Sequence, residues 1–282
     1  MLSHPNNLTG DNLMKVANKV IVVTGAGSGM GRELVLALLR KGARIAAVDL
    51  NGETLKETIA LAGQNGDKVS SHMVNVSDRQ AVEALPSAVI AAHGAVDGII
   101  NNAGIIQPFV RLNDLQYDAI ERVLNVNLYG VIYMTKAFLP HLLTRPVAHI
   151  ANVSSMGGFF PVPGQTVYGA SKAAVKLMTE GLYAELLDTN VRVTTVFPGA
   201  IATNITQNSG VAIEWLAADD AAQSFPMTSA EAAAEIIIDG MERDRFQVYV
   251  GRDAKIMNLF YRLNPKRATQ FMYSRMKELL AS

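Results

Sequence analysis

The stretch Lys19–Asp49, KVIVVTGAGSGMGRELVLALLRKGARIAAVD, decides the fold of this chain. Lys19–Thr24 is rich in β-branched residues and predicts a buried strand, and Gly29–Lys41 has the leucine spacing of a helix. A second strand is expected at Arg44–Asp49. A strand, a glycine-rich turn, a helix and a further apolar strand form the repeating unit of a parallel sheet whose faces are covered by helices.

The same alternation continues along the chain to Val250. We therefore expect a doubly wound, Rossmann-type α/β fold with three αβα layers, in one domain over residues 19–251. Residues 1–18 would precede it as an extension, and residues 252–282 would add a C-terminal helical extension of roughly two helices. Further helices are expected at Glu53–Ala62, Asp78–Ala92, Leu115–Leu143, Val167–Leu187 and Ser229–Met241. Further strands are expected at Val69–Val74, Val96–Asn101, Ala148–Ser154, Arg192–Phe197 and Gln247–Val250.

Composition excludes several classes of protein. The 25 basic and 25 acidic side chains balance, which argues against a nucleic-acid-binding surface. No cysteine is present, so disulfides and thiolate metal sites are excluded. The five histidines are scattered, and we expect no metal. No apolar run reaches the roughly 18 residues of a membrane span, and the opening lacks a signal-peptide pattern, so we expect a cytoplasmic protein.

The turn Thr24–Gly31 has the pattern T-G-x-x-x-G-x-G between the first strand and the first helix. Glycines at such a turn let the backbone approach a pyrophosphate, whose charge faces the helix N-terminus. Asp49 ends the second strand, 18 residues beyond Gly31. A carboxylate there can accept hydrogen bonds from the adenosine ribose and repels a 2′-phosphate, and Ser28 adds no compensating charge. The sequence favours NAD over NADP.

Tyr168 and Lys172 lie four residues apart at the start of an expected helix, so the phenol and the ammonium share one helix face. A free tyrosine, with a pKa of about 10, is a weak base near neutrality, and a neighbouring cation lowers that pKa. Taken alone this spacing is typical of many structural helices. Ser155, however, lies 13 residues earlier at the end of a predicted strand, and Asn102, Asn127 and Pro198 stand near the ends of others. Ligands of open α/β sheets bind at these strand ends.

This ordered set of motifs resembles the short-chain dehydrogenase/reductase family, from about Lys19 to Gly251. The resemblance implies that Tyr168 exchanges a proton with the substrate oxygen and that Ser155, rather than Ser154, hydrogen-bonds that oxygen. Lys172 would lower the pKa of Tyr168 and hold the nicotinamide ribose, and Asn127 would hold a water. The expected cofactor-binding residues are Gly25, Ser28, Gly29, Met30, Gly31, Asp49, Asn75, Val76, Asn102, Ala103, Gly104, Tyr168, Lys172, Pro198, Gly199, Ile201 and Thr203.

Two departures from the family pattern stand out. Asn75 precedes Val76 where the family often has an aspartate, which keeps a hydrogen-bonding side chain without its charge. The chain also continues for about thirty residues beyond Gly251, with basic and apolar residues intermixed. This tail is similar to that of some family members acting on lipophilic alcohols. For the tail, solvent or a partner subunit in a homodimer or homotetramer is favoured over a membrane surface.

The substrate end is expected to be apolar. The loop between Ser155 and Tyr168 contains no charged side chain, and residues 203–227 can fold over the nicotinamide as a lid. Apolar walls with a few polar groups suit an uncharged, lipophilic small molecule. The expected pocket residues are Met156, Phe159, Phe160 and Trp215.

The sequence therefore predicts an NAD-dependent enzyme that interconverts a secondary alcohol and a ketone, of steroid, retinoid or aliphatic type. A 3-oxoacyl thioester reductase of the same family is the nearest alternative, disfavoured by Asp49 and by the tail. A non-catalytic dinucleotide sensor or a purely structural subunit would have no use for the complete set of Ser155, Tyr168 and Lys172.

Overall fold

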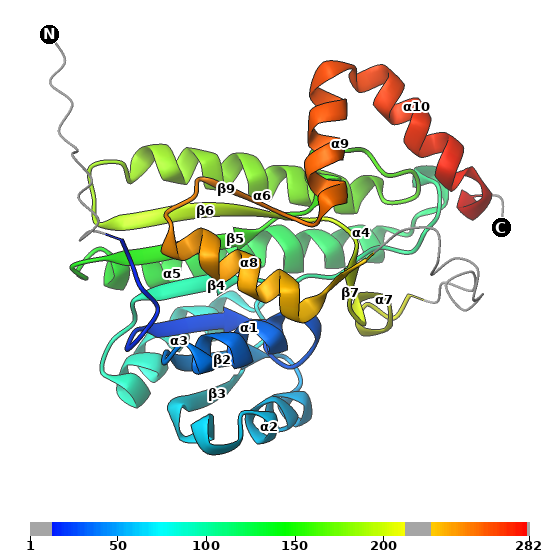
Figure 1. The fold of residues 1–282 in the computed structure, drawn as a ribbon. Helices are drawn as coiled ribbons and strands as arrows, with labels where there is room; N and C mark the ends of the chain where they lie inside the picture. Colours follow the sequence, from blue (N-terminus) through cyan, green and yellow to red (C-terminus); the bar gives the residue numbers. More distant parts are fainter. Residues whose placement is uncertain (1–12, 212–226, 281–282) are drawn as a thin grey trace, which may run out of the picture.

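A seven-stranded parallel sheet forms the centre of the protein (Figure 1). The structure is a computed structural model and describes residues 13–211 and 227–280. The sheet has the order β3-β2-β1-β4-β5-β6-β9, which confirms the doubly wound α/β fold. The strands are β1 (Val20–Thr24), β2 (Arg44–Asp49), β3 (Val69–Met73), β4 (Gly98–Asn101), β5 (Ala148–Val153), β6 (Val191–Pro198) and β9 (Gln247–Val250).

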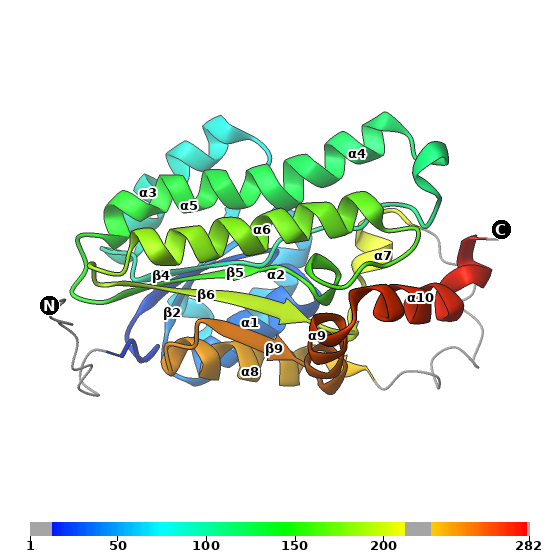
Figure 2. The ribbon, with the colours of Figure 1, turned by 90° about the horizontal axis from the view of Figure 1, so that it is seen from above.

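Helices cover both faces of the sheet (Figure 2). One face carries α1 (Gly29–Arg40), α2 (Gly52–Leu61) and α8 (Ala230–Glu242). The other carries α3 (Arg79–His93), α4 (Tyr117–Leu124), α5 (Gly130–Leu142) and α6 (Thr166–Glu185). Short 3₁₀ turns occur at Gly63–Lys68, Leu112–Asp114, Met156–Gly158 and Lys277–Leu280.

Each side of the sheet has its own apolar core. Leu34 and Leu38 of α1 pack with Ile237 of α8 on one side, and Phe138 of α5 packs with Val89 of α3 on the other. Every residue of β1 and β5 is buried, so neither strand alternates between buried and exposed positions. Strand order reverses between β1 and β4, which opens a crevice at the carboxyl ends of the strands.

Most sequence-based boundaries agree with the structure to within one or two residues, but the helix expected at Leu115–Leu143 is not uniform. It consists of α4, a π-helical turn at Asn125–Tyr129, and α5. The turn contains the buried Asn127, whose amide reaches the main chain of Ile105 on the neighbouring segment. A π-helical turn continues the helix without ending it, so the sequence analysis predicted one helix here.

The segments beyond the alternation lie at the carboxyl end of the sheet (Figure 1). They include α7 (Ile205–Asn208) and a small parallel pair in which β7 (Ile201–Ala202) bonds β8 (Thr228–Ser229). The tail forms α9 (Arg252–Leu263) and α10 (Pro265–Met276), and Asn264 caps α10 by accepting from Arg267 N. These two helices match the two expected.

The glycine at position 31 provides a test of packing between β1 and α1. A Cβ there would overlap the carbonyl oxygen of Gly25 and lie 2.7 Å from Asn102 Nδ2. We predict that Gly31→Ala destabilises the protein by about 1–3 kcal/mol, the usual cost of overpacking, in urea unfolding. Gly181→Ala is the control, because its Cβ would meet nothing within 4 Å on the exposed side of α6 and should stabilise by about 0.5–1 kcal/mol. Equal effects of the two substitutions would contradict the close-approach argument.

Candidate active site

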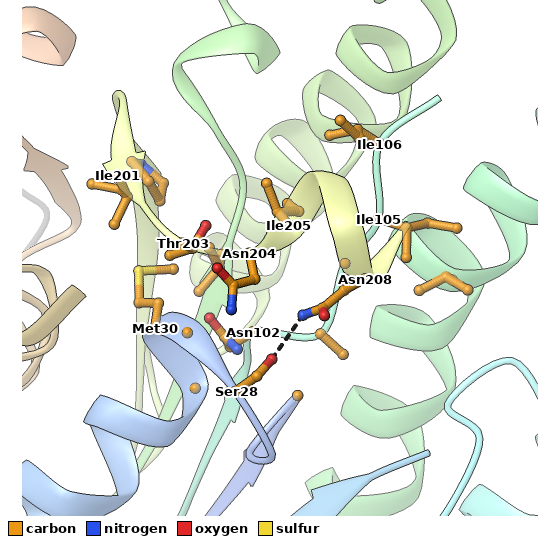
Figure 3. A pocket seen from close by; sticks show the side chains of 18 of the residues that line it. Ser28, Met30, Asn102, Ile105, Ile106, Ile201, Thr203, Asn204, Ile205 and Asn208 are labelled. Carbon is orange, nitrogen blue, oxygen red and sulfur yellow. Dashed lines mark hydrogen bonds between the residues drawn. The ribbon is translucent and has the colours of Figure 1, made fainter. Parts of the chain in front are cut away.

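One groove runs across the carboxyl ends of the strands and has a volume of about 650 Å³. It is lined by all seventeen residues that the sequence analysis assigns to the cofactor (Figure 3). Its walls also include residues that the sequence analysis did not single out: Leu50, Asn51, Thr54, Val74, Ile105, Ile106, Val126, Val153, Ser154, Ala200, Asn204, Ile205 and Asn208. Seven of these thirteen residues are next in sequence to a predicted site residue, so their places follow from chain continuity rather than from a motif of their own.

The glycine-rich turn is held against the end of β4 by the buried Thr24. Its hydroxyl accepts hydrogen bonds from Asn102 N and Ala103 N, each at 3.0 Å, and Asn102 Nδ2 donates to Thr24 O at 2.9 Å. Gly25 adopts a φ of +68° directly beside Ala103, where a side chain would be strained. The two segments therefore form a single backbone cradle.

Asp49 is fixed at the far end of the groove by the main chain. Oδ2 accepts from Gly27 N at 2.9 Å and Oδ1 from Asn51 N at 3.0 Å. Each carboxylate oxygen has a further lone pair, so these bonds leave acceptor capacity towards the groove. Asn75 and Val76 line the same end.

Three polar side chains meet at the opposite end, beyond β5. Ser155 follows β5, while Tyr168 and Lys172 come from the first turns of α6, and all three line the groove. Lys172 Nζ donates to Val153 O at 3.0 Å. Ser154, which also lines the groove, donates its hydroxyl proton to Lys172 O at 2.7 Å.

Asn127 does not line the groove but braces one of its walls. Its Oδ1 accepts from Ile105 N, and its Nδ2 donates to Ile105 O and to Ser171 Oγ. Ser171 Oγ in turn donates to Tyr168 O at 2.7 Å. The amide of Asn127 thereby links the segment after β4 to the helix that carries Tyr168 and Lys172.

The chain after β6 closes the remaining side of the groove. Thr203 lies against Gly29, where an added Cβ would come within 3.2 Å. Asn208 Nδ2 donates to Ser28 Oγ at 2.8 Å, so α7 is joined to the glycine-rich turn across the groove (Figure 3). Ala200 N donates to the carboxylate of Asp253 at 2.7 Å, which fastens α9 to the segment after β6. No spacing in the sequence marks Asn208 or Asp253.

The expected substrate-pocket residues are distributed differently from the cofactor residues. Phe160 is fully buried and packs edge-on against Tyr261 of the tail, and Phe159 packs against Phe197 and Tyr249. Within the described residues neither ring lines the groove, nor does Met156, so their place in a substrate pocket stays a prediction. The aromatic partners come from distant strands and from the tail, which apolarity alone does not indicate. Trp215 lies outside the described residues.

Comparison with known proteins gives a consistent result. The family model for short-chain dehydrogenases matches residues 19–213. SadH of Mycobacterium tuberculosis, a protein named as an oxidoreductase, is 39% identical over 250 residues, which is 87% of this chain and 90% of SadH. The 3-oxoacyl-[acyl-carrier-protein] reductase FabG of Thermotoga maritima is 37% identical over 69% of this chain and 78% of its own length.

Solved structures agree with this match. A short-chain dehydrogenase/reductase from Burkholderia phymatum in complex with NAD has a TM-score of 0.77 and 28% identity, covering 84% of this chain and 90% of that one. A short-chain dehydrogenase from Burkholderia cenocepacia in complex with NADP has a TM-score of 0.76 and 27% identity, covering 92% and 99%. The chain belongs to the short-chain dehydrogenase/reductase family.

Members of this oxidoreductase family bind a nicotinamide dinucleotide, and the groove of this short-chain dehydrogenase fits that group. A Cβ at Gly25 or Gly31 would collide with Asn102, Ala103 or Gly25 itself, so glycine at both positions is what lets the backbone form this cradle, and a carboxylate stands at the other end. Within residues 13–211 and 227–280, no cluster of three or more histidine, aspartate or glutamate side chains is placed to hold a metal. The helices described there include none with the length and apolarity to cross a membrane.

Burial shapes the electrostatics of the reacting end in this dehydrogenase. Loss of solvent raises the pKa of Tyr168 above its usual value, and a hydrogen bond with Ser155 lowers it in part. Loss of solvent also lowers the pKa of Lys172 to about 8, because the ammonium is taken out of water. Without the cofactor, both groups are thus biased towards their neutral forms.

The lowered pKa of Lys172 implies a stability cost that depends on pH. At pH 7 the folded and unfolded states both carry the ammonium, and a shift from 10.5 to about 8 corresponds to about 3 kcal/mol against the folded state. We predict that Lys172→Met raises the free energy of unfolding of the cofactor-free protein at pH 7 by up to about that amount.

The advantage of Lys172→Met should shrink as pH rises from about 8 towards 10.5, because the folded wild type then loses its proton while the unfolded chain keeps one. Urea unfolding at pH 7 and pH 10 measures this difference. Lys176→Met, one turn along α6 at a partly exposed position, is the control and should show no such trend. A pH-independent difference for Lys172→Met would refute the assignment.

Proposed function

We propose that this protein is an NAD-dependent dehydrogenase/reductase that interconverts a secondary alcohol and a ketone. The observation that carries the proposal is the convergence of Ser155, Tyr168 and Lys172 at one end of a groove whose other end holds Asp49. A hydroxyl, a phenol and a buried ammonium at one place are the groups needed to bind a carbonyl oxygen and move a proton to or from it.

In the proposed reaction, the bound nicotinamide supplies or accepts the hydride. The phenol of Tyr168 gives its proton to the carbonyl oxygen during reduction and, as phenolate, takes it from the alcohol during oxidation. Ser155 donates a hydrogen bond to the same oxygen and so holds it beside the phenol. Charge that develops on the oxygen is stabilised by donors already in place, without reorganisation of water.

Lys172 would serve two purposes in this proposal. Its ammonium lies beside Gly104 and Asn127, where a Cβ on Gly104 would come within 3.1 Å of Nζ. A cation at that point favours the phenolate of Tyr168 and offsets the burial that raises the pKa of the phenol. It would also donate to the ribose next to the nicotinamide. The helix positions of both side chains, one turn apart, fix this relation.

The preference for NAD rests on the carboxylate of Asp49. Two main-chain N–H groups orient it, so its remaining lone pairs are available to two ribose hydroxyls. A 2′-phosphate in the same place would meet like charge at short range. Among the groove-lining residues at this end, Leu50, Asn51 and Thr54 offer no basic side chain to compensate.

A lipophilic substrate is supported by the surroundings of the reacting end. The tail covers the loop after β5: Tyr261 packs on Phe160, and Leu280 lies against Gly164, where a Cβ would come within 2.9 Å. We propose that the tail from residue 252 onward shapes the substrate side. The lid expected at residues 203–227 falls largely on residues 212–226, which lie outside the described part of the chain. Assembly into a homodimer or homotetramer is part of the proposal.

The alternative is reduction of a 3-oxoacyl thioester, which the 37% identity to FabG of Thermotoga maritima favours. Activity towards acetoacetyl-CoA with NADPH, against oxidation of 2-octanol with NAD, separates the two. A non-catalytic dinucleotide sensor would bind NAD and turn over neither substrate.

The first test is Tyr168→Phe, which removes the proton-transfer group and keeps the ring. We predict that turnover of 2-octanol with NAD falls by about 10²–10⁴, because that is the usual contribution of a general acid–base group. Binding of NADH, followed by fluorescence, should be nearly unchanged. Tyr273→Phe on the exposed side of α10 is the control and should keep full activity. An active Tyr168→Phe enzyme would exclude the proposed role.

The second test is Asp49→Ala. We expect kcat/KM with NAD to fall, because the substitution removes charge-assisted hydrogen bonds to the ribose. The ratio of kcat/KM with NADP to kcat/KM with NAD should rise, because the repulsion of a 2′-phosphate is also removed. Steady-state kinetics with both cofactors measure the ratio. Asp188→Ala, at an exposed position after α6, is the control. A wild-type enzyme that already prefers NADP would overturn the assignment of Asp49.

A further inference from the structure

Gln107 lies three residues beyond Gly104, and its side chain is completely buried against the start of α6. Its Oε1 accepts hydrogen bonds from Val167 N and from Tyr168 N, both at 2.9 Å. One of the two main-chain groups it holds thus belongs to the residue that carries the phenol. None of the family motifs in the sequence includes Gln107.

These two bonds replace the usual cap of a helix. The first N–H groups of a helix have no partner within it, and a serine, threonine or aspartate at the N-cap normally accepts from the second or third. In α6 the N-cap position is Gln165, whose side chain makes no capping bond. Val167 and Tyr168 are the second and third residues of α6, so Gln107 caps this helix from 60 residues away.

The rest of the Gln107 amide is bonded as well. Nε2 donates to Gly164 O at 2.9 Å, and the main-chain oxygen of Gln107 accepts from Gln165 Nε2 at 2.8 Å. Because an oxygen must face the two N–H groups and a nitrogen must face the carbonyl, the orientation of the amide is determined by its partners. A rotation of the amide by half a turn about the Cγ–Cδ bond would break all three of its side-chain hydrogen bonds.

The segment that contains Gln107 also forms one wall of the groove. Ile105 and Ile106 line it; Ile105 is bonded on both sides by Asn127, and Ile106 N donates to Ser209 Oγ at 3.0 Å. Gln107 therefore ties the main chain of Tyr168 directly to a groove wall, whereas Lys172 is tied to β5 through Val153 O. One end of this helix turn is therefore held by the segment after β4 and the other by β5.

We propose that Gln107 is a positioning residue: its amide sets the place of the Tyr168 phenol relative to the substrate and the nicotinamide. The inference rests on the proposed role of Tyr168 as the acid–base group. Since a displacement of about 1 Å can cost about 10²-fold in rate, a loosened first turn of α6 should lower kcat more than it lowers binding.

The experiment compares Gln107→Met with Gln107→Glu in the full-length protein. The Met variant keeps the length of the side chain and removes both acceptor and donor, while the Glu variant keeps an acceptor for the two N–H groups. We expect Gln107→Met to reduce kcat for 2-octanol with NAD by about 10–10²-fold, with the Kd for NADH within twofold of wild type. Gln107→Glu should recover part of that loss, because its second oxygen faces Gly164 O without a proton to donate.

Gln165→Met is the matched control. This substitution removes the amide of a neighbouring buried glutamine, together with its hydrogen bonds to Gln107 O and Gly164 O. It leaves the two hydrogen bonds by which Gln107 caps α6. It should lower the melting temperature and retain kcat within about threefold. If Gln107→Met yields no folded protein, Gln107→Asn takes its place, because it keeps a buried amide and withdraws it by one carbon–carbon bond.

Amide hydrogen exchange at Val167 and Tyr168 tests the cap independently of activity. Exchange at these two amides should accelerate in Gln107→Met and not in Gln165→Met. This result does not depend on alcohol oxidation. If the wild type oxidises no alcohol but the exchange differs as expected, the proposed function is wrong and the assignment of Gln107 as the cap of α6 holds. Unchanged exchange, equal loss of kcat in Gln107→Met and Gln165→Met, or a loss confined to NADH affinity would each overturn the inference.

Discussion

The proposed reacting end of this short-chain dehydrogenase depends on a cation that is held out of water. The ammonium of Lys172 is buried between β5 and α6, and its hydrogen bond to Val153 O offsets only part of the lost hydration. A site built this way gains strong electrostatic effects, because charges interact more strongly where water is excluded. Burial of the ammonium also lowers the stability of the folded state, and packing of the surrounding sheet has to offset that cost.

The offsetting stability comes from strands that are buried along their whole length. β1 and β5 have no exposed residue, and β4 lies between them, so the carboxyl ends of three central strands are rigid where the groove begins. Thr24, Asn102 and Lys172 are all fixed to main-chain groups at these ends. Most groove residues lie in the segments that directly follow these strand ends, so their positions depend on the register of the sheet.

This dependence explains how much the sequence could predict. Strand and helix positions follow from local apolar patterns, and the residues of the groove follow from short motifs at the strand ends, as with Gly25, Asp49 and Lys172. Contacts between distant segments leave no such trace: the cap that Gln107 places on α6 and the bond from Ala200 to Asp253 each join positions more than 50 residues apart. The same holds for Phe160, whose partner Tyr261 belongs to the tail.

The pairing of β7 with β8 has a consequence for how such a protein can change. Ile201 and Thr228 are register partners, so the chain before Val211 and the chain after Met227 are joined through one small sheet. Closing a loop at fixed ends becomes only slowly more costly as the loop grows. A change of chain length between Val211 and Met227 should therefore cost little stability, whereas the stretch before it is fixed to the groove through Asn208 and Ser209.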